Sequence, residues 1–362
     1  MTILVLCREE NLCNTLARYA QAIRQAGVRL VCVENGFSFN GAVEDLLRVC
    51  PEQPSMILHP EADVPYLPWG LSAVDIPTAC FQVDTYAYTK RRIAWSMLFD
   101  RVIVFHPGYD VRFQRAGHPG ACFFPHAVEA EFYCGAETER IFEVGWVGQM
   151  KGAIYGKRGL ILPSLAQAFR MNDFDRRYAI EDMAQIYRQS RIVVNVGRDD
   201  YPQDANLRTF EAMAAGALLI TALPSELTEI GFEDGVHFIG YRKDREIADL
   251  VRKYLNDESA RKHIAEAGHE KVLREHTYDV RVKRLLDGVA TGGKLQAPAR
   301  YWNEGRVRRI YLDYFAGNGA LAEATAELPK IALRSPKDAL IGAALVGRAW
   351  GRRLRAKLRP GA

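Results

Sequence analysis

A carboxylate stands near the start of a short helix pattern in the second half of the chain. Residues 191–221 read as a strand, a polar loop, a helix, a glycine stop and another strand. Free backbone N–H groups and the helix dipole make such a loop and helix start suitable for anions. Glu211, about one turn into the helix, could accept hydrogen bonds from the vicinal hydroxyls of a ribose. Alternatively, it only gains from the dipole behind a cap that Asn206 or Asp204 supplies.

The composition is typical of a soluble globular protein of about two domains. Of 362 residues, 48% are apolar and 25% are charged, and this length exceeds one ordinary core. The seven cysteines are odd in number and lack metal-ligand spacing, so we expect small core residues in a reduced compartment. The first residues lack the pattern of a signal peptide, and no run is apolar enough to span a bilayer. We therefore expect a cytoplasmic protein.

The positive charge is concentrated in the C-terminal stretch. Residues 331–362 contain eight basic residues and one acid, a net charge of +7, while the whole chain has +4 and the remainder therefore −3. This distribution gives no indication of a nucleic-acid groove. Within the stretch, residues 338–358 place apolar side chains largely on one helical face and arginines on the other. That pattern suits a helix lying on an anionic membrane surface, or a basic helix that covers an apolar groove of the protein itself.

The fold class follows from alternation of strand and helix patterns. Two series of short apolar runs are separated by helical patterns or polar loops, which predicts an α/β protein with parallel sheets. The turn after the first run lacks a glycine-rich dinucleotide fingerprint, which argues against nicotinamide or flavin binding. We predict an N-terminal domain over residues 1–138, a second α/β domain over 139–290, and a returning helix with a basic amphipathic tail over 291–362.

The segment FEAMAAGALLIT, which follows a polar loop, resembles the donor-binding segment of GT-B glycosyltransferases of the group-1 and CgeB-like type. The resemblance implies two Rossmann-like domains that face a central cleft. It also implies that Glu211 contacts the donor ribose and that Gly216 ends the helix. Many relatives have a glutamate eight positions upstream that contacts the donor sugar. Gln203 takes that place here, and neighbouring loop residues such as Arg198 could replace the missing contact.

The segment FEVGWVGQMKGAIYGKRGLIL is similar to the first strand of the family's second domain and the basic pair that follows it. By that resemblance, Lys157 and Arg158 would neutralise the donor diphosphate, with Lys151 as a substitute. Cations at this place stabilise charge on the leaving group. The full donor-binding set that we predict is Glu211, Lys157, Arg158, Gly148, Asn206, Leu207, Arg208, Gln203, Asn195 and Arg198.

Two candidates for chemistry lie in the first half of the chain. Asp84, in CFQVDTYAYTKRR, could take the proton of an acceptor hydroxyl, or could cap the helix that follows. Thr85 and Tyr88 would then line the acceptor pocket. His126, in FFPHAVEAEFY, could contact donor or acceptor, or could be an ordinary loop histidine.

Together these features predict a metal-independent hexosyltransferase that moves a sugar from a nucleotide diphosphate sugar to a glycan or lipid-linked acceptor. Bacterial surface polysaccharide or lipopolysaccharide assembly, at the inner face of the cell membrane, would suit the tail. No DxD motif flanked by strands is present, so we expect no metal and no cofactor beyond the donor. We also expect no nucleic-acid partner. A non-catalytic GT-B binding subunit and a nucleotide-sugar epimerase remain alternatives.

Overall fold

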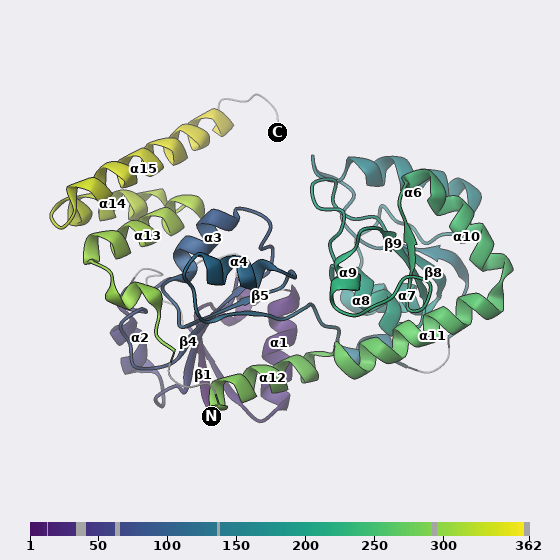
Figure 1. The fold of residues 1–362 in the computed structure, drawn as a ribbon, viewed down its shortest axis with the longest axis horizontal. Helices are drawn as coiled ribbons and strands as arrows, with labels where there is room; N and C mark the ends of the chain where they lie inside the picture. The colour runs from purple at the N-terminus through teal and green to yellow at the C-terminus, as the bar shows by residue number, and fades with distance from the viewer. Residues whose placement is uncertain (13, 34–40, 62–65, 136–137, 292–294, 358–362) are drawn as a thin grey trace. The chain divides into compact units, whose positions relative to one another are not determined.

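Two parallel sheets organise the chain, as the alternation of patterns predicts (Figure 1). The computed structural model describes residues 1–12, 14–33, 41–61, 66–135, 138–291 and 295–357. The first compact unit comprises Met1–Phe123 and Arg284–Ala362, and the second comprises Phe124–Lys283. Their boundaries differ from the predicted ones at 138 and 290. The predicted linker residue Ala136 and the predicted breaks at Gly292 and Gly293 lie outside the described residues.

The first unit contains a six-stranded sheet of order β2-β1-β3-β4-β5-β6, in which every pair is parallel. All residues of β1, β3 and β4 are buried, as expected for apolar strands covered on both faces. The strand order reverses direction between β1 and β3, where open α/β sheets tend to bind ligands at the carboxyl ends. The elements are β1 Thr2–Val5, η1 Glu9–Asn11, α1 Asn14–Gln25, β2 Arg29–Cys32, α2 Val43–Val49, β3 Met56–His59, β4 Thr78–Gln82, α3 Thr89–Ser96, β5 Arg101–Val104, α4 Tyr109–Arg115 and β6 Ala121–Phe123.

The chain returns to the first unit through α12 (Tyr278–Thr291) and η3 (Pro298–Tyr301), which precede three further helices. These are α13 (Glu304–Gly317), α14 (Leu321–Ala332) and α15 (Pro336–Lys357), and they pack against one another (Figure 1). From α13, Tyr311, Tyr314 and Phe315 are buried in the core of the first unit. The α13 helix therefore completes the core of the first unit.

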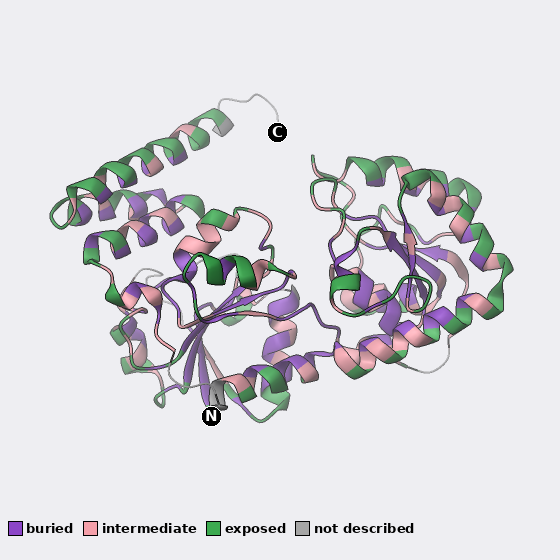
Figure 2. Cartoon of the chain, viewed as in Figure 1, coloured by how far each residue is buried: buried purple, intermediate pink, exposed green. Residues whose placement is uncertain are grey.

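The α15 helix has a buried face and an exposed apolar face (Figure 2). Val346 and Ala349 are buried in the first unit's core, so part of the helix covers an apolar surface, as one of the two interpretations predicts. Leu340 and Leu354 nevertheless remain 76% and 56% exposed. The predicted end of this helix at residue 358 lies outside the described residues. Among the helices that the structure describes, none combines the length and the hydropathy needed to cross a membrane.

The second unit contains a four-stranded parallel sheet of order β10-β9-β8-β7. Its strands overlap the apolar runs of the second predicted series, which are IFEVGWVG, RIVVNV, ALLIT and VHFIG. The six cysteines that the structure describes are all free, while Cys13 lies outside the described residues. The elements are α5 Ala130–Tyr133, β7 Phe142–Gly145, α6 Gly156–Ala168, α7 Ile180–Arg188, β8 Ser190–Asn195, α8 Leu207–Ala214, β9 Leu218–Ala222, α9 Glu226–Glu229, β10 Ile239–Tyr241, η2 Asp244–Glu246, α10 Ile247–Asn256 and α11 Glu258–Glu275.

The segments that begin and end the second unit are bonded to each other. The N–H of Val128 donates to the carbonyl of His276 at 2.9 Å, and Arg281 Nε donates to the carbonyl of Pro125 at 3.0 Å. Arg281 also donates to Nδ1 of the buried His276 at 2.6 Å. Burial, followed by the charge of Arg281, lowers the pKa of His276 to about 3. His276 is therefore neutral in the folded protein at physiological pH.

This buried histidine should make the second unit sensitive to acid. Below its unfolded pKa of about 6.5, His276 gains a proton only in the unfolded chain until the pH approaches about 3. The free energy of unfolding should thus fall with pH across that window, by up to about 1.4 kcal/mol per pH unit from this group. His276→Gln keeps an acceptor for Arg281 but cannot titrate. Urea unfolding at pH 6.5 and at pH 4.5 gives the decrease in the free energy of unfolding between the two pH values. This decrease should be smaller for His276→Gln than for the wild type by roughly 2 kcal/mol.

The exposed His263 provides the matched control, since His263→Gln should keep the wild-type dependence on pH. Equal losses of stability in His276→Gln and the wild type would contradict the assignment of a neutral, buried His276.

Candidate functional site

In the second unit, two arginines lie over one aromatic ring at the carboxyl end of the sheet. Trp146 directly follows β7 and is fully buried. Asn172 accepts from its backbone N–H and donates to its carbonyl, both at 2.9 Å. The guanidinium carbons of Arg158 from α6 and Arg208 from α8 lie 5.4 Å and 4.9 Å from the centre of the ring. Both distances are within the range of cation–π attraction, so the ring gathers two positive charges.

Arg208 is held by groups at the ends of two strands. Its Nε donates to the carbonyl of Val147 at 2.9 Å, and its Nη1 donates to Oδ1 of Asn195 at 2.7 Å. Asn195 is the buried last residue of β8 and donates in turn to Thr221 in β9 at 3.0 Å. The side chain of Asn206 accepts from the backbone N–H of Arg208 at 3.1 Å and so caps α8. The predicted cap is confirmed, and Arg208 is fixed where the helix begins.

Arg158 is buried without a carboxylate against it. Its Nε donates to the carbonyl of Val196 at 3.0 Å, its Nη1 donates to that of Gln149 at 2.7 Å, and it lies over the ring of Tyr155 at 4.1 Å. Burial, and then the nearby charge of Arg208, lower the pKa of Arg158 to about 10, so it remains charged at neutral pH. Among the described residues, neither arginine forms an ion pair with a carboxylate. An anion bound beside both would relieve their mutual repulsion.

Gly148 leaves room for this arrangement. A Cβ at this position would collide with the guanidinium of Arg208 and would lie 3.0 Å from the ring of Trp146. The requirement for glycine therefore comes from a close approach of side chains.

The predicted basic pair Lys157 and Arg158 separates in the structure. Lys157 is half exposed and its Nζ lies 3.2 Å from a carboxylate oxygen of Asp244. Consecutive residues of a helix point in directions about 100° apart, so the two cannot face one small ligand from the same side. Arg208, in place of Lys157, is the cation beside Arg158. The carboxylate of Asp199 accepts from the N–H groups of Gly156 and Lys157 at 2.8 Å and 3.3 Å, and so offsets positive charge at the start of α6.

Glu211 lies on α8, and its side chain contacts Tyr133. Its half-buried carboxylate accepts a hydrogen bond from the hydroxyl of Tyr133 in α5. Burial, and then the charge of Glu211, raise the pKa of Tyr133 far above its usual range. Tyr133 stacks on Tyr187, with ring centres 6.4 Å apart. Sequence reasoning missed both tyrosines, because nothing in the spacing of α5, α7 and α8 indicates that they meet.

Glu226 of α9 forms hydrogen bonds that hold the loop between β8 and α8 in place. The buried carboxylate of Glu226 accepts from the hydroxyl of Tyr201 at 2.6 Å and from the N–H of Ala205 at 3.1 Å. Its own N–H donates to the carbonyl of Gln203 at 2.9 Å. These bonds fix the backbone around Gln203, whose side chain is partly exposed. This role of Glu226 was not predicted.

Three other predicted residues lie in the second unit. Arg198 forms a double hydrogen bond with Asp200, at 2.9 Å for each contact. This contact lowers the pKa of Asp200. Leu207 is the first residue of α8. His126 is buried in the segment that begins the unit, near His276.

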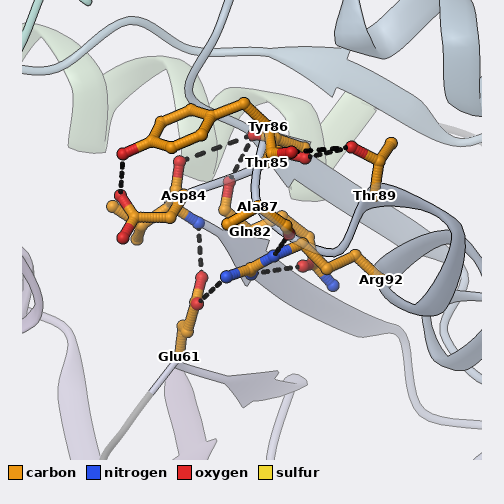
Figure 3. Close-up of polar contacts among 9 residues, drawn as sticks. Glu61, Gln82, Asp84, Thr85, Tyr86, Ala87, Thr89 and Arg92 are labelled. Atoms are coloured by element: carbon orange, nitrogen blue, oxygen red, sulfur yellow. Dashed lines mark hydrogen bonds and ion pairs between the residues drawn. The ribbon is translucent and has the colours of Figure 1, made fainter. Parts of the chain in front are cut away.

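Asp84 lies in the first unit, in the loop after β4, and its side chain is exposed (Figure 3). The hydroxyl of Tyr86 donates to one of its carboxylate oxygens at 3.5 Å. The expected alternative, a cap for the following helix, is wrong: α3 begins after Tyr88 and has no side-chain cap. The Asp84 carboxylate is thus accessible from solvent.

A partly buried ion pair supports this loop (Figure 3). Glu61 accepts from the N–H of Val83 at 2.5 Å and pairs with Arg92 at 2.6 Å. Arg92 also donates to Oε1 of Gln82 at 2.9 Å and to the carbonyl of Ala87 at 2.8 Å. These contacts fix the backbone on both sides of the Asp84 loop, and neither Glu61 nor Arg92 was predicted to do so.

Comparisons with known proteins agree with this architecture. Residues 140–287 match a family described as glycosyl transferase-like. No curated protein sequence matches the chain. Among solved structures, Anabaena Alr3699/HepE in complex with UDP has 12% sequence identity and a TM-score of 0.59, covering 80% of this chain and 100% of that one.

Two further structures are similar across most of the chain. A glycosyltransferase from Rickettsia africae ESF-5 has 9% identity and a TM-score of 0.57, with 81% of this chain and 99% of that chain covered. Sucrose-phosphate synthase from Thermosynechococcus elongatus has 11% identity and a TM-score of 0.54, with 81% and 100% covered. The chain thus has the GT-B fold of two Rossmann-like domains found in group-1 glycosyltransferases, and its residues 140–287 match the glycosyl transferase-like family.

Proposed function

We propose that the protein transfers a sugar from a nucleoside diphosphate sugar to an acceptor without a metal ion. The observation that carries this proposal is the pair of charged guanidinium groups, Arg158 and Arg208, held over Trp146 at the start of α8. A bound diphosphate would neutralise the positive charge of these two guanidinium groups. The match of residues 140–287 to a glycosyl transferase-like family supports it. So do the HepE structures, which hold UDP, UDP-glucose, or UDP and glucose.

In the proposed reaction, the bond between the anomeric carbon and the diphosphate oxygen breaks, and negative charge develops on the departing nucleoside diphosphate. Arg158 and Arg208 stabilise that charge, together with the N–H groups at the start of α8. These are fixed charges, since backbone carbonyls and Asn195 hold them before the reaction begins. Glu211 accepts from the ribose hydroxyls, and Tyr133 orients its carboxylate.

The acceptor hydroxyl loses a proton as it attacks the anomeric carbon. Asp84 is our proposed base for a reaction that inverts configuration, because its carboxylate is exposed on a loop whose backbone is fixed. His126 is the second catalytic candidate, as a contact to donor or acceptor. In a reaction that retains configuration, the leaving phosphate itself assists the attack.

Calorimetric titration with UDP, GDP, ADP and CDP, in the presence of EDTA, tests the donor site. Arg208→Gln should weaken binding of the preferred nucleoside diphosphate about 10- to 100-fold, the usual value of hydrogen bonds to a charged group. It should leave the weaker binding of the corresponding nucleoside unchanged. Glu211→Gln should weaken both ligands, because both contain the ribose.

Arg252→Gln is the matched control, since this exposed arginine on α10 pairs only with Asp249 among the described residues. Failure of the wild type to bind any of the four diphosphates, both with EDTA and without it, would refute the proposed function. Binding that EDTA abolishes would refute metal independence.

Asp84→Asn separates binding from chemistry. If Asp84 is the base, the variant should bind the nucleoside diphosphate like the wild type while kcat for transfer falls about 100- to 10,000-fold. Transfer followed by NMR would also give the anomer of the product. A kcat within threefold of the wild type would exclude Asp84 as the base. Conversion of the donor to an isomer without an acceptor would favour an epimerase, and binding without turnover would favour a non-catalytic subunit.

We further propose that the acceptor is a glycan or lipid-linked molecule at the inner membrane face, as in surface polysaccharide or lipopolysaccharide assembly. The support is the exposed face of α15, where Leu340, Trp350 and Leu354 are 76%, 41% and 56% exposed. Exposed Arg353 and Arg355 flank this face. Apolar side chains between basic ones suit the boundary of an anionic bilayer.

Flotation with phosphatidylglycerol vesicles tests this placement. The double variant Leu340→Gln and Leu354→Gln should reduce the bound fraction more than tenfold, because each buried leucine contributes roughly 1.5–3 kcal/mol. Val49→Gln, at an equally exposed position on α2, should float like the wild type. Phosphatidylcholine vesicles should bind less protein. Equal flotation of the double variant and the wild type would refute membrane contact through α15.

A further inference from the structure

A pocket of about 560 Å³ lies within the first unit, beside the carboxyl end of β3. Its volume lies in the range of small-molecule sites. It is next to the reversal of strand order, where ligands of open α/β sheets bind. Residues from β3, α3, the end of α13 and α15 form its walls, and Glu61 and Arg92 link it to the loop that carries Asp84.

The charge of the pocket is positive on the side of α15. Arg348 and Arg352, one turn apart on this helix, line it together with Arg91 from α3. Among the described residues, Arg348 and Arg352 have no ion pair, while Arg91 lies 3.4 Å from Asp313. Arg91 passes over Gly317, where a Cβ would collide with it. Burial, with a contribution from Arg352, lowers the pKa of Arg91. Of these three guanidinium groups, only Arg91 forms an ion pair with a carboxylate in the described part of the chain.

Aromatic side chains form the opposite part of the lining. Trp95 and Tyr314 are buried, and their rings lie 5.3 Å apart. Tyr88 is 81% exposed and has a φ of 55°. A left-handed conformation is rare for a bulky residue and costs about 1–3 kcal/mol, and such residues cluster at functional sites. An exposed aromatic ring held at this energetic cost suits stacking on a sugar ring.

A buried polar atom also remains unpaired in this lining. His59, at the end of β3, is 3% exposed, and its Nε2 lies 2.8 Å from the hydroxyl of Tyr314. No hydrogen-bond partner is found for its Nδ1 among the described residues. His59 lines the pocket, and burial lowers its pKa to about 4, so the ring is neutral at physiological pH.

We propose that this pocket binds a sugar that carries a phosphoryl group, with Arg91, Arg348 and Arg352 on the phosphate and Tyr88 against the ring. The inference rests on the proposed function and names the class of its acceptor. The phosphoryl group has two sources with the same chemistry: a soluble sugar phosphate, or a lipid phosphate to which the sugar is attached. In either case α15 recognises the acceptor, and does more than cover the core of the first unit.

Calorimetry with glucose 1-phosphate, glucose and geranyl phosphate tests the pocket, with saturating UDP present to occupy the proposed donor site. Glucose 1-phosphate or geranyl phosphate should bind at least tenfold more tightly than glucose. The double variant Arg348→Gln and Arg352→Gln should weaken that binding at least tenfold. Preference for geranyl phosphate would identify a lipid phosphate as the source, and preference for glucose 1-phosphate would identify a soluble one. Tyr88→Ala should weaken glucose 1-phosphate but leave inorganic phosphate unchanged.

The matched control is Arg112→Gln with Arg115→Gln, which removes the same charge from exposed positions on α4 of the first unit, outside the pocket. Binding of neither phosphate by the wild type, or an equal loss in both double variants, would overturn the proposal. UDP titrations of each variant separate this result from a failure of the proposed function. A wild type that binds UDP but neither phosphate ligand would overturn only the pocket proposal, whereas a wild type that binds no UDP would overturn the proposed function.

Discussion

Two like charges held close together beside one aromatic ring are the constraint on which the second unit's site depends. Arg158 and Arg208 are positioned by carbonyl groups of Val147, Val196 and Gln149, with no carboxylate among their ion-pair partners in the described part of the chain. A carboxylate in contact would cancel their charge. Neutral dipoles satisfy the N–H groups of a guanidinium without doing so. The site therefore retains a net positive potential in a partly buried place, where the effect on an anion is greater than in water.

Much of this architecture could be predicted from the sequence. The apolar runs mark every strand of both sheets, because buried parallel strands require continuous apolar residues. The cap at Asn206 was also predictable, since its signal is local. The orientation of side chains was not. Lys157 and Arg158 look like a pair in the sequence, but a helix turns them apart, and the residue that replaces Lys157 comes from another helix. Contacts between residues that are far apart in the sequence cannot be predicted from local residue spacing.

Contacts between distant segments also explain the other differences. Tyr133 belongs to the second unit because it stacks on Tyr187, although a break in the sequence near residue 138 suggested a later boundary. Glu226 holds the loop before α8 from a helix further along the chain. The pattern of the tail predicted a helix with one apolar and one basic face. In the structure, one side of α15 packs on the core, one is exposed and apolar, and one lines a pocket.

The first unit is formed by two separate parts of the chain, so it cannot be completed until the second part has been synthesised. A ribosome releases the sheet of the first unit first, then the whole of the second unit, and only then α13, α14 and α15. Trp95 and Phe99 pack in the same core as Tyr314, so they have no complete core until the last part of the chain emerges. The second unit is continuous and can fold while synthesis proceeds. During that interval the nascent chain exposes an apolar surface on its first half, which is where a chaperone would be expected to bind.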